Sequence, residues 1–322
     1  MNPCVLFRVA AGPRLGFGHL VRCRTIGAAL GVRPVVSLRG TVGAARVAAS
    51  LGLRLAGPLQ TALRNVRPSL LVVDDPSLRW VARSIAAARR VGIATASLHD
   101  LGIALSDADL TIDGSIAPGR ADLASVRFAV LDRQLMDLAP RRSARFDRPT
   151  VVVAFGGGSR RRLTTAVARA IARRCPEADV RVAYGFAACA AVPEHAHIRS
   201  LDPARGFRKN LASATVAVLA GGVTLYEACA LGVPAVGVSI VRAQRKAVAG
   251  LARQGAVIDG GRARSTTATA VRIARLVVGL LDDATRRKRL SRAGRQIVDG
   301  RGATRVAAAL RALINARGRR AA

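Results

Sequence analysis

The chain has 322 residues, of which 51% are hydrophobic, and this composition excludes an intrinsically disordered protein. It is long enough for two domains, each with its own core, and no apolar run reaches the roughly 18 residues of a membrane span. Lysine and arginine together number 52 against 19 acidic residues, a formal net charge of +33. A charge of that size normally indicates a nucleic acid or an anionic membrane as partner.

The basic residues are nearly all arginine, since only Lys209, Lys246 and Lys288 are lysines. Together with the abundance of alanine, this indicates a compositional bias of the source genome. Aromatic residues make up 3%, which leaves few side chains to stack on bases. We therefore expect no specific nucleic-acid partner and a monomer or weak dimer, while peripheral contact with an anionic membrane stays open.

The cysteines are odd in number and widely spaced, which favours reduced thiols over a disulfide framework or a zinc site. They are Cys4, Cys23, Cys175, Cys189 and Cys229. The N-terminal run carries Arg8 among apolar residues and lacks the layout of a secretory signal. We expect a cytoplasmic protein without a metal or cofactor.

Short apolar runs alternate with helical patterns in the first half, which is typical of βαβ units and parallel sheets. Strands are predicted near 5–10, 34–38, 70–74, 93–97 and 110–112. Helices are predicted near 20–30, 42–51 and 78–91. A polar stretch with a proline at each end, 140–149, is the predicted linker.

The same alternation restarts after the linker, so we predict domains at 1–145 and 146–322. Strands are expected near 150–155, 180–184, 198–201, 215–219 and 235–240. Helices are expected near 163–174, 224–231, 246–254, 267–281, 284–298 and 304–315. The arginine-rich tail after them is expected to fray. Doubly wound folds bind ligands at the carboxyl ends of their strands, which predicts a cleft between the two domains.

The first glycine-rich turn, Gly16-Phe17-Gly18-His19, follows the first strand. Its glycines permit a tight turn and close approach of a ligand to the backbone. His19 falls in the first turn of a helix, where the positive end of the helix dipole keeps the ring neutral, and Arg22 lies one turn further on the same side. A neutral histidine beside an arginine suits a general base near an anionic substrate. The alternative is a helix-capping histidine in an ordinary turn.

The second turn consists of Gly156, Gly157, Gly158 and Ser159. Backbone amides that lead into a helix bind anions, so we expect phosphate here. The spacing and lysine of a P-loop are missing. The arginines at 160–162 would add charge for a diphosphate or simply be solvated.

The third turn contains Gly221, Gly222, Thr224 and Glu227. Thr-x-x-Glu is the pattern of a capping box, worth about 1 kcal/mol to a helix start. The functional alternative is that Glu227 accepts hydrogen bonds from ribose hydroxyls while the glycine amides face phosphate. Gln244 follows the next strand, at the same edge of the sheet.

Asp74 and Asp75 stand at the end of a predicted strand. They would supply a second acid–base group or a metal ligand, or else cap the next helix and pair with Arg79. We retain Asp74 as a candidate catalytic residue. His99 and Asp100 are similarly placed, with a role in binding substrate or none.

Taken in order, these motifs resemble one family. They are Gly-x-Gly-His-x-x-Arg-Cys at 16–23, Phe-Gly-Gly-Gly at 155–158, Gly-Gly-x-Thr-x-x-Glu at 221–227, and Gly-x-Pro at 232–234 followed by Gln244. The set resembles the UDP-sugar hydrolase of the pseudaminic acid pathway and related spore-coat polysaccharide proteins. That group is similar to the GT-B transferase that adds N-acetylglucosamine in peptidoglycan synthesis. The resemblance implies a GT-B-like α/β fold, two Rossmann-like domains whose parallel sheets face an interdomain cleft.

The resemblance also implies roles for these residues. His19 would activate water, or an acceptor hydroxyl in a transferase, and Gly16, Gly18 and Arg22 would lie against the substrate. The second and third turns would surround the diphosphate of a UDP-sugar, Glu227 would hold the ribose, and Gln244 would lie near the sugar or phosphate. Attack at the anomeric carbon would break the C1–O bond and release UDP, without an obvious need for a metal.

The chain departs from the hydrolase pattern at Asp74-Asp75-Pro76, where the hydrolases carry an aspartate, a variable residue and a tyrosine. The sugar, and the choice between hydrolysis and transfer, therefore stay open. Three alternatives remain: a GT-B glycosyltransferase on a UDP-sugar donor, a basic protein that binds nucleic acid or an anionic surface, and a non-catalytic binding protein of the same fold.

Overall fold

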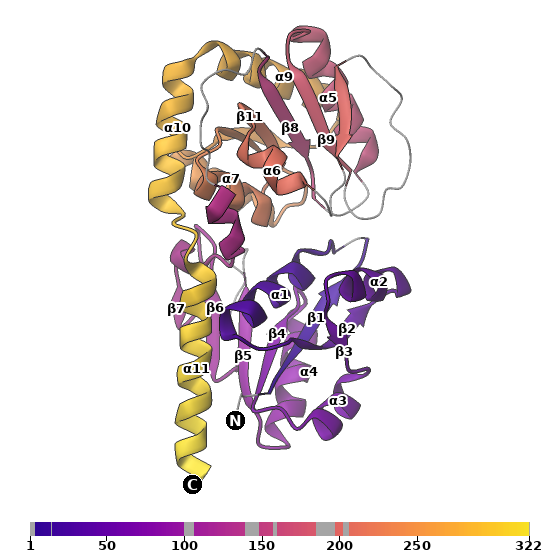
Figure 1. Ribbon diagram of the computed structural model, residues 1–322, viewed down its shortest axis with the longest axis vertical. Coiled ribbons are helices and arrows are strands. Elements are labelled where there is room, and N and C mark those ends of the chain that lie inside the picture. Colours follow the sequence, from indigo (N-terminus) through magenta and orange to yellow (C-terminus); the bar gives the residue numbers. More distant parts are fainter. Residues whose placement is uncertain are drawn as a thin grey trace. The chain divides into compact units, whose positions relative to one another are not determined.

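The computed structural model describes residues 4–13, 15–99, 106–138, 148–156, 160–184, 197–201 and 206–321. The chain forms two α/β units, each a parallel sheet with helices packed on it (Figure 1). Unit 1 comprises Met1–Arg133 and Arg301–Ala322, and unit 2 comprises Gln134–Gly300. The prediction of two Rossmann-like units is confirmed. In the described part of the chain, no helix combines the length and apolar character needed to cross a bilayer.

Unit 1 contains a seven-stranded sheet in the order β3-β2-β1-β4-β5-β6-β7. From β1 the chain moves outward to β3, then returns to place β4 on the other side of β1, so the winding direction reverses between β1 and β4. The strands are β1 (Val5–Ala11), β2 (Val35–Gly40), β3 (Arg54–Leu55), β4 (Leu70–Asp74), β5 (Ala94–His99), β6 (Leu110–Asp113) and β7 (Leu123–Ala124). The helices are α1 (Gly18–Leu30), α2 (Val42–Ser50), α3 (Leu59–Val66), α4 (Leu78–Arg89) and α11 (Gly302–Ala321), with one 3₁₀ turn, η1 (Val126–Phe128). A second 3₁₀ turn, η2 (Arg133–Leu138), begins at the boundary and lies in unit 2 from its second residue on.

Unit 2 contains a six-stranded parallel sheet in the order β10-β9-β8-β11-β12-β13, and its winding direction reverses between β8 and β11. The strands are β8 (Thr150–Ala154), β9 (Asp179–Ala183), β10 (Ile198–Leu201), β11 (Val216–Ala220), β12 (Ala235–Ser239) and β13 (Ile258–Arg262). The helices are α5 (Arg161–Arg174), α6 (Phe207–Ala212), α7 (Val223–Leu231), α8 (Gln244–Arg253), α9 (Thr266–Asp282) and α10 (Ala284–Ile297).

The central strands of both sheets are the continuous apolar runs of the sequence. Every residue of β1, β4, β8, β11 and β12 is buried. Helices cover both faces of such sheets, so their strands must be apolar throughout rather than alternating. This is why the sequence predicted these five strands to within a residue or two, whereas it gave no signal for the two-residue edge strands β3 and β7.

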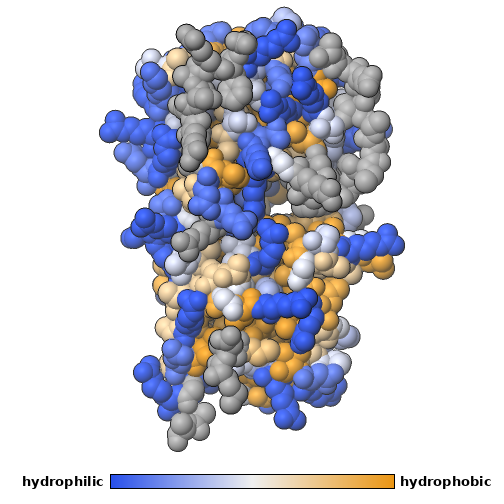
Figure 2. Space-filling model, viewed as in Figure 1, coloured by the Kyte–Doolittle hydropathy of each residue, from blue (hydrophilic) through white to orange (hydrophobic). Residues whose placement is uncertain are grey.

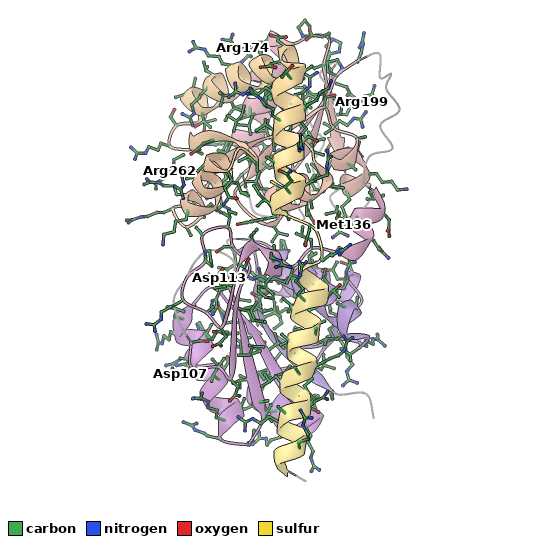
Figure 3. All side chains as sticks on the ribbon, turned by 90° about the vertical axis from the view of Figure 1, so that its left-hand side faces the viewer. Asp107, Asp113, Met136, Arg174, Arg199 and Arg262 are labelled. Carbon is green, nitrogen blue, oxygen red and sulfur yellow. The ribbon has the colours of Figure 1, made fainter. Side chains whose placement is uncertain are left out.

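The arginine excess lies mainly on the outside. Arg174, Arg199 and Arg262 are exposed, and nitrogen-tipped side chains project from both units (Figure 3). A guanidinium keeps its hydration there while its aliphatic stem packs on the helix surface. The positive net charge is therefore a property of the protein surface and not of the two hydrophobic cores.

The C-terminal helix α11 belongs to unit 1. Its buried Val306 and Leu310 continue an apolar stripe, and the guanidinium of Arg311 donates to the carbonyl of Ala29 at 2.8 Å. The predicted domains 1–145 and 146–322 therefore differ from the two units, because a linear pattern does not show onto which sheet a helix folds back. Helix α11 continues through the arginine-rich tail to Ala321, beyond the helix end predicted near 315, and fraying of that tail stays a prediction.

We expect Gly302→Ala to destabilise unit 1. A Cβ at this position would lie 2.0 Å from the carbonyl oxygen of Ala129, a backbone atom that cannot move aside easily. Overpacking of this kind costs about 1–3 kcal/mol. Denaturant unfolding should show that loss, whereas the control Gly279→Ala, in the interior of α9 with no atom within 4 Å of the new Cβ, should be neutral or stabilising. Equal stability of the two variants would contradict the assigned contact.

Candidate functional site

The first glycine-rich turn closes on itself before α1 begins. The amide of Gly16 donates to the carbonyl of Gly12 at 2.7 Å, and the amide of Gly12 donates back at 3.1 Å. Gly16 has φ +83°, a left-handed conformation that favours glycine. Gly18 is the first residue of α1, with no atom within 4 Å of the position a Cβ would take. His19 therefore stands in the first turn of the helix, as predicted.

His19, Arg22 and Asp74 form one cluster. The Nδ1 atom of His19 lies 2.8 Å from Oδ1 of Asp74. The guanidinium of Arg22 donates to both carboxylate oxygens, from Nε at 2.6 Å and from Nη2 at 2.5 Å. Since β1 and β4 are adjacent parallel strands, the turn after β1 and the end of β4 share one edge of the sheet. That edge is where the winding direction reverses, the place where open α/β sheets bind ligands.

Asp74 is ionised in this cluster. Burial by itself would raise the pKa of the carboxyl group, but the charges and hydrogen bonds of Arg22 and His19 outweigh it and hold the pKa well below the usual 3.8. An ionised carboxylate can only accept, so Nδ1 of His19 donates to it. Nη2 of Arg22, 2.9 Å from Nδ1, is then a close neighbour of the ring rather than a donor to it.

This arrangement fixes the tautomer of His19. With the proton on Nδ1, the basic nitrogen of the neutral ring is Nε2, and Asp74 stabilises the imidazolium that forms when Nε2 takes up a proton. The side chain of His19 is 14% exposed, whereas those of Arg22 and Asp74 are almost fully buried. Solvent therefore reaches the ring of His19 but not the side chains of Arg22 and Asp74.

Asp75 has a structural role. Its carboxylate accepts from Nε and Nη2 of Arg39 at 2.6 and 2.8 Å and from the amide of Ser77 at 2.9 Å, just before α4. The predicted pairing of the aspartates with Arg79 is thus replaced by Arg39 for Asp75 and Arg22 for Asp74. The sequence did not reveal these partners, because the pairing depends on the order β2-β1-β4 in the sheet.

His99, the last residue of β5, is buried, with Nε2 3.2 Å from Oγ of Ser97. It lies at the same sheet edge as Asp74, on the neighbouring strand. Asp100 lies outside the described residues. A substrate role for either residue remains a prediction.

The second glycine-rich turn is described only at its start. Gly156 follows β8 with φ +85°, and Phe155 before it is buried. Gly157, Gly158 and Ser159 lie outside the described residues, so the phosphate site expected there remains a prediction. Helix α5 begins at Arg161, whose guanidinium lies 5.8 Å from the ring centroid of Tyr184.

The structure of the third turn differs from two of the predictions, the capping box and the role of the glycine amides. Helix α7 begins at Val223 with Gly222 as its N-cap, so Thr224 and Glu227 are its second and fifth residues and do not form a capping box. The amides of Gly221 and Gly222 already donate to the carbonyls of Val238 and Ala220. They are not available to phosphate. A helix leaves its first-turn amides without intrahelical acceptors, and in α7 these include the amides of Val223 and Thr224.

Gly221 is instead required by packing. A Cβ there would lie 2.6 Å from Cγ2 of Val248 and 3.0 Å from Cβ of Gln244, so α8 approaches the turn too closely for any side chain. Packing against α8 is therefore sufficient to explain a glycine at position 221, without the approach of a ligand.

Glu227 and Gln244 lie at the same edge of the unit 2 sheet as this turn. Glu227 is buried, with Oε1 3.7 Å from Nη2 of Arg208 on α6, a partner that the sequence analysis missed. Gln244 is the first residue of α8; its Oε1 accepts from the amide of Ile240 at 2.9 Å, which turns its Nε2 donor toward Gly222. Because β8, β11 and β12 are adjacent and parallel, Gly156, Gly222 and Gln244 share one edge, at the point of reversal.

The described cysteines are free thiols: Cys23, Cys175 and Cys229 are buried, and Cys4 is partly exposed. Burial, together with the nearby charge of Asp74, raises the pKa of Cys23 well above its usual value, so this thiol is not a nucleophile. Within the described ranges, no three side chains of the metal-binding types come together.

Comparison with known proteins places the fold but not the family. No protein-family model matches the chain, and no curated protein matches it. Solved structures do match along nearly its whole length. The spinosyn forosaminyltransferase SpnP is 16% identical with a TM-score of 0.71, covering 98% of this chain and 100% of its own. The chain has a GT-B-like fold.

Two further matches have ligands in their names. The spinosyn rhamnosyltransferase SpnG complexed with thymidine diphosphate is 15% identical, with a TM-score of 0.67 over 96% of this chain and 99% of its own. The UDP-GlcNAc 2-epimerase of Neisseria meningitidis bound to UDP-GlcNAc is 11% identical, with a TM-score of 0.62 over 95% and 99%. At these identities the likeness concerns the fold alone.

Proposed function

We propose that this chain is an enzyme that transfers the glycosyl group of a nucleoside diphosphate sugar to a hydroxyl acceptor. The observation that carries the proposal is the cluster of His19, Asp74 and Arg22 at the reversal point of the unit 1 sheet. A dyad of this kind orients one nitrogen to accept a proton, which glycosyl transfer to an oxygen nucleophile requires.

The chemical step follows from that geometry. Nε2 of His19 takes the proton of the acceptor hydroxyl while its oxygen attacks the anomeric carbon. The bond between C1 and the diphosphate oxygen breaks, and the nucleoside diphosphate leaves with the electron pair. Asp74 offsets the positive charge that develops on the imidazole. General-base catalysis of this kind typically accelerates a reaction by about 10²–10⁴-fold.

Unit 2 would bind the nucleotide. Glu227 supplies carboxylate oxygens for the ribose hydroxyls, and the amides of Val223 and Thr224 at the start of α7 supply donors for the diphosphate. Nε2 of Gln244 adds a further donor beside Gly222. Helix amides of this kind stabilise the charge on a departing diphosphate. Known proteins of this fold bind thymidine diphosphate or UDP-GlcNAc, which supports a nucleotide-sugar substrate and leaves UDP as our first choice of nucleotide.

Hydrolysis is the second candidate, since the same base would activate water in place of an acceptor. The motif resemblance to the pseudaminic acid hydrolase favours it, whereas the fold likeness to glycosyltransferases favours transfer. A panel of UDP- and TDP-sugars incubated without an acceptor separates the two. Release of nucleotide without acceptor indicates hydrolysis, and release that depends on an added alcohol indicates transfer. Binding of neither nucleotide would contradict both candidates.

We expect Glu227→Gln to weaken UDP binding about tenfold or more in calorimetry, because a neutral amide accepts more weakly from ribose hydroxyls than a carboxylate. The matched control is Glu177→Gln, since Glu177 is exposed just before β9. Thermal unfolding of both variants separates a binding effect from loss of the contact with Arg208. Undiminished affinity in a folded Glu227→Gln protein would contradict the assigned role.

A further inference from the structure

Unit 1 exposes large hydrophobic side chains at one edge of its sheet. Leu15, Val42 and Leu78 follow β1, β2 and β4, which are neighbours in the sheet, and Trp80 stands in the first turn of α4. Each is at least 36% exposed, and Val42 is 73% exposed. We call these four residues the apolar edge. Single exposed hydrophobics are ordinary, but a group on adjacent loops marks an interaction surface.

The loops that carry the apolar edge contact one another. Cγ2 of Thr41, just before Val42, lies 4.0 Å from the position a Cβ would take on Gly12 in the turn after β1. The guanidinium of Arg39, at the end of β2, lies 5.5 Å from the ring centroid of Trp80 and is held there by Asp75. The turns after β1, β2 and β4 are therefore parts of one surface. In the space-filling view, hydrophobic side chains are exposed around α2, with hydrophilic ones projecting beside them (Figure 2).

Positive charge lies beside this surface. Residues 1–99 include 14 arginines, no lysine and only two acidic residues, Asp74 and Asp75. Both aspartates are buried and already paired with arginine. Arg79 and Arg83 are exposed beside Trp80, and the guanidinium of Arg83 lies 5.3 Å from its ring centroid. The apolar edge is thus bordered by cations that carboxylates in this part of the sequence do not neutralise.

We propose that the apolar edge docks the protein on an anionic lipid bilayer. Aliphatic side chains at loop ends enter the interfacial layer of a bilayer, and tryptophan is enriched in that layer. Each nearby arginine adds about 1 kcal/mol of binding free energy through its attraction to anionic headgroups. A nucleic acid would use the arginines but would leave exposed leucine and valine without a partner. The docking goes beyond the proposed reaction and does not depend on it. It would bring the edge that carries His19 to hydroxyl groups at a membrane surface.

Trp80 is the only tryptophan in the chain, so intrinsic tryptophan fluorescence reports on the apolar edge alone. Vesicles of equal parts phosphatidylglycerol and phosphatidylcholine should shift the emission of the full-length protein to shorter wavelength, and brominated lipid should quench it. Vesicles of phosphatidylcholine alone should produce a much smaller change. Unchanged emission with the anionic vesicles would overturn the proposal.

Sedimentation with the same vesicles tests the aliphatic side chains. The double variant Val42→Ser/Leu78→Ser should bind at least about tenfold more weakly, since each side chain loses apolar surface buried in the interface. The matched control is Val91→Ser/Val271→Ser, which changes two exposed hydrophobic side chains that do not belong to the apolar edge. Thermal unfolding confirms that both variants are folded.

Three results would overturn membrane docking. Equal loss in the two double variants would mean that the position of the apolar residues is irrelevant. Unchanged vesicle binding in both double variants would mean that the protein binds only through general electrostatic attraction. Binding of duplex DNA at physiological salt, with the same shift of Trp80 emission, would assign the surface to nucleic acid. None of these assays contains a nucleotide sugar, so failure here is separate from failure of the proposed enzymatic function.

Discussion

His19→Ala should reduce turnover of a nucleotide sugar by about 10²–10⁴-fold and leave nucleotide affinity nearly unchanged. The reason is that His19 acts only when a proton leaves the attacking oxygen, while the proposed nucleotide contacts come from unit 2. The loss should appear in kcat with little change in the dissociation constant of UDP. Nucleotide release measures the first quantity and calorimetry the second.

The control for this variant is His197→Ala, which removes an imidazole in unit 2, just before β10. Its turnover should match that of the unchanged protein. His19→Gln is a second, subtler variant, because its amide can still donate to Asp74 yet cannot accept a proton at neutral pH. Turnover in His19→Gln above about a tenth of the original would mean that the ring positions the substrate rather than acting as a base.

The sequence predicted the elements that form the centres of the sheets, for a physical reason. A strand covered on both faces must be apolar along its whole length, so β1, β4, β8, β11 and β12 stand out from single-residue hydropathy. Helix α3 was missed because it is short and keeps only Ala62 and Leu63 buried. Its apolar residues, Leu59, Ala62, Leu63 and Val66, do recur at helical spacing, but eight residues show that pattern over only about two turns. Helix α6 was missed for the same reason, with two buried residues, and with it the arginine that approaches Glu227.

In the candidate site too, features set by neighbouring residues were predictable, whereas contacts between strands were not. Local rules placed His19 at the start of α1 and Gly156 at the end of β8, because glycine and the change from strand to helix periodicity are visible in the sequence. Partners across strands were not predictable. Arg22 and Asp74 are 52 residues apart in sequence and meet only because β4 lies next to β1 in the sheet. The capping-box prediction failed because Gly222, not Thr224, has the extended backbone of an N-cap.

Asp74→Asn should cost about 3–5 kcal/mol of unfolding free energy, the largest stability effect we expect in this protein. The buried guanidinium of Arg22 would lose its carboxylate and keep its charge in a site from which water is excluded. Denaturant unfolding measures the loss. The double variant Asp74→Asn/Arg22→Met, which removes both charges, should recover most of it. If the double variant were no more stable than the single one, the cost would come from packing rather than from an unpaired charge.

The pH dependence of unfolding gives an independent test of the same cluster. The pKa of Asp74 is lower in the folded protein than its usual 3.8, so the folded state binds fewer protons than the unfolded chain in acid. Its contribution to stability is therefore complete above about pH 4–5 and is lost as the pH falls through the lower, folded value. Asp74→Asn should flatten this acid limb, although Asp109 and Asp122, whose pKa values are also lowered, keep part of it. An acid limb of unchanged steepness in the variant would show that Asp74 does not hold its charge through contact with Arg22 and His19, and the orientation of the general base would lose its support.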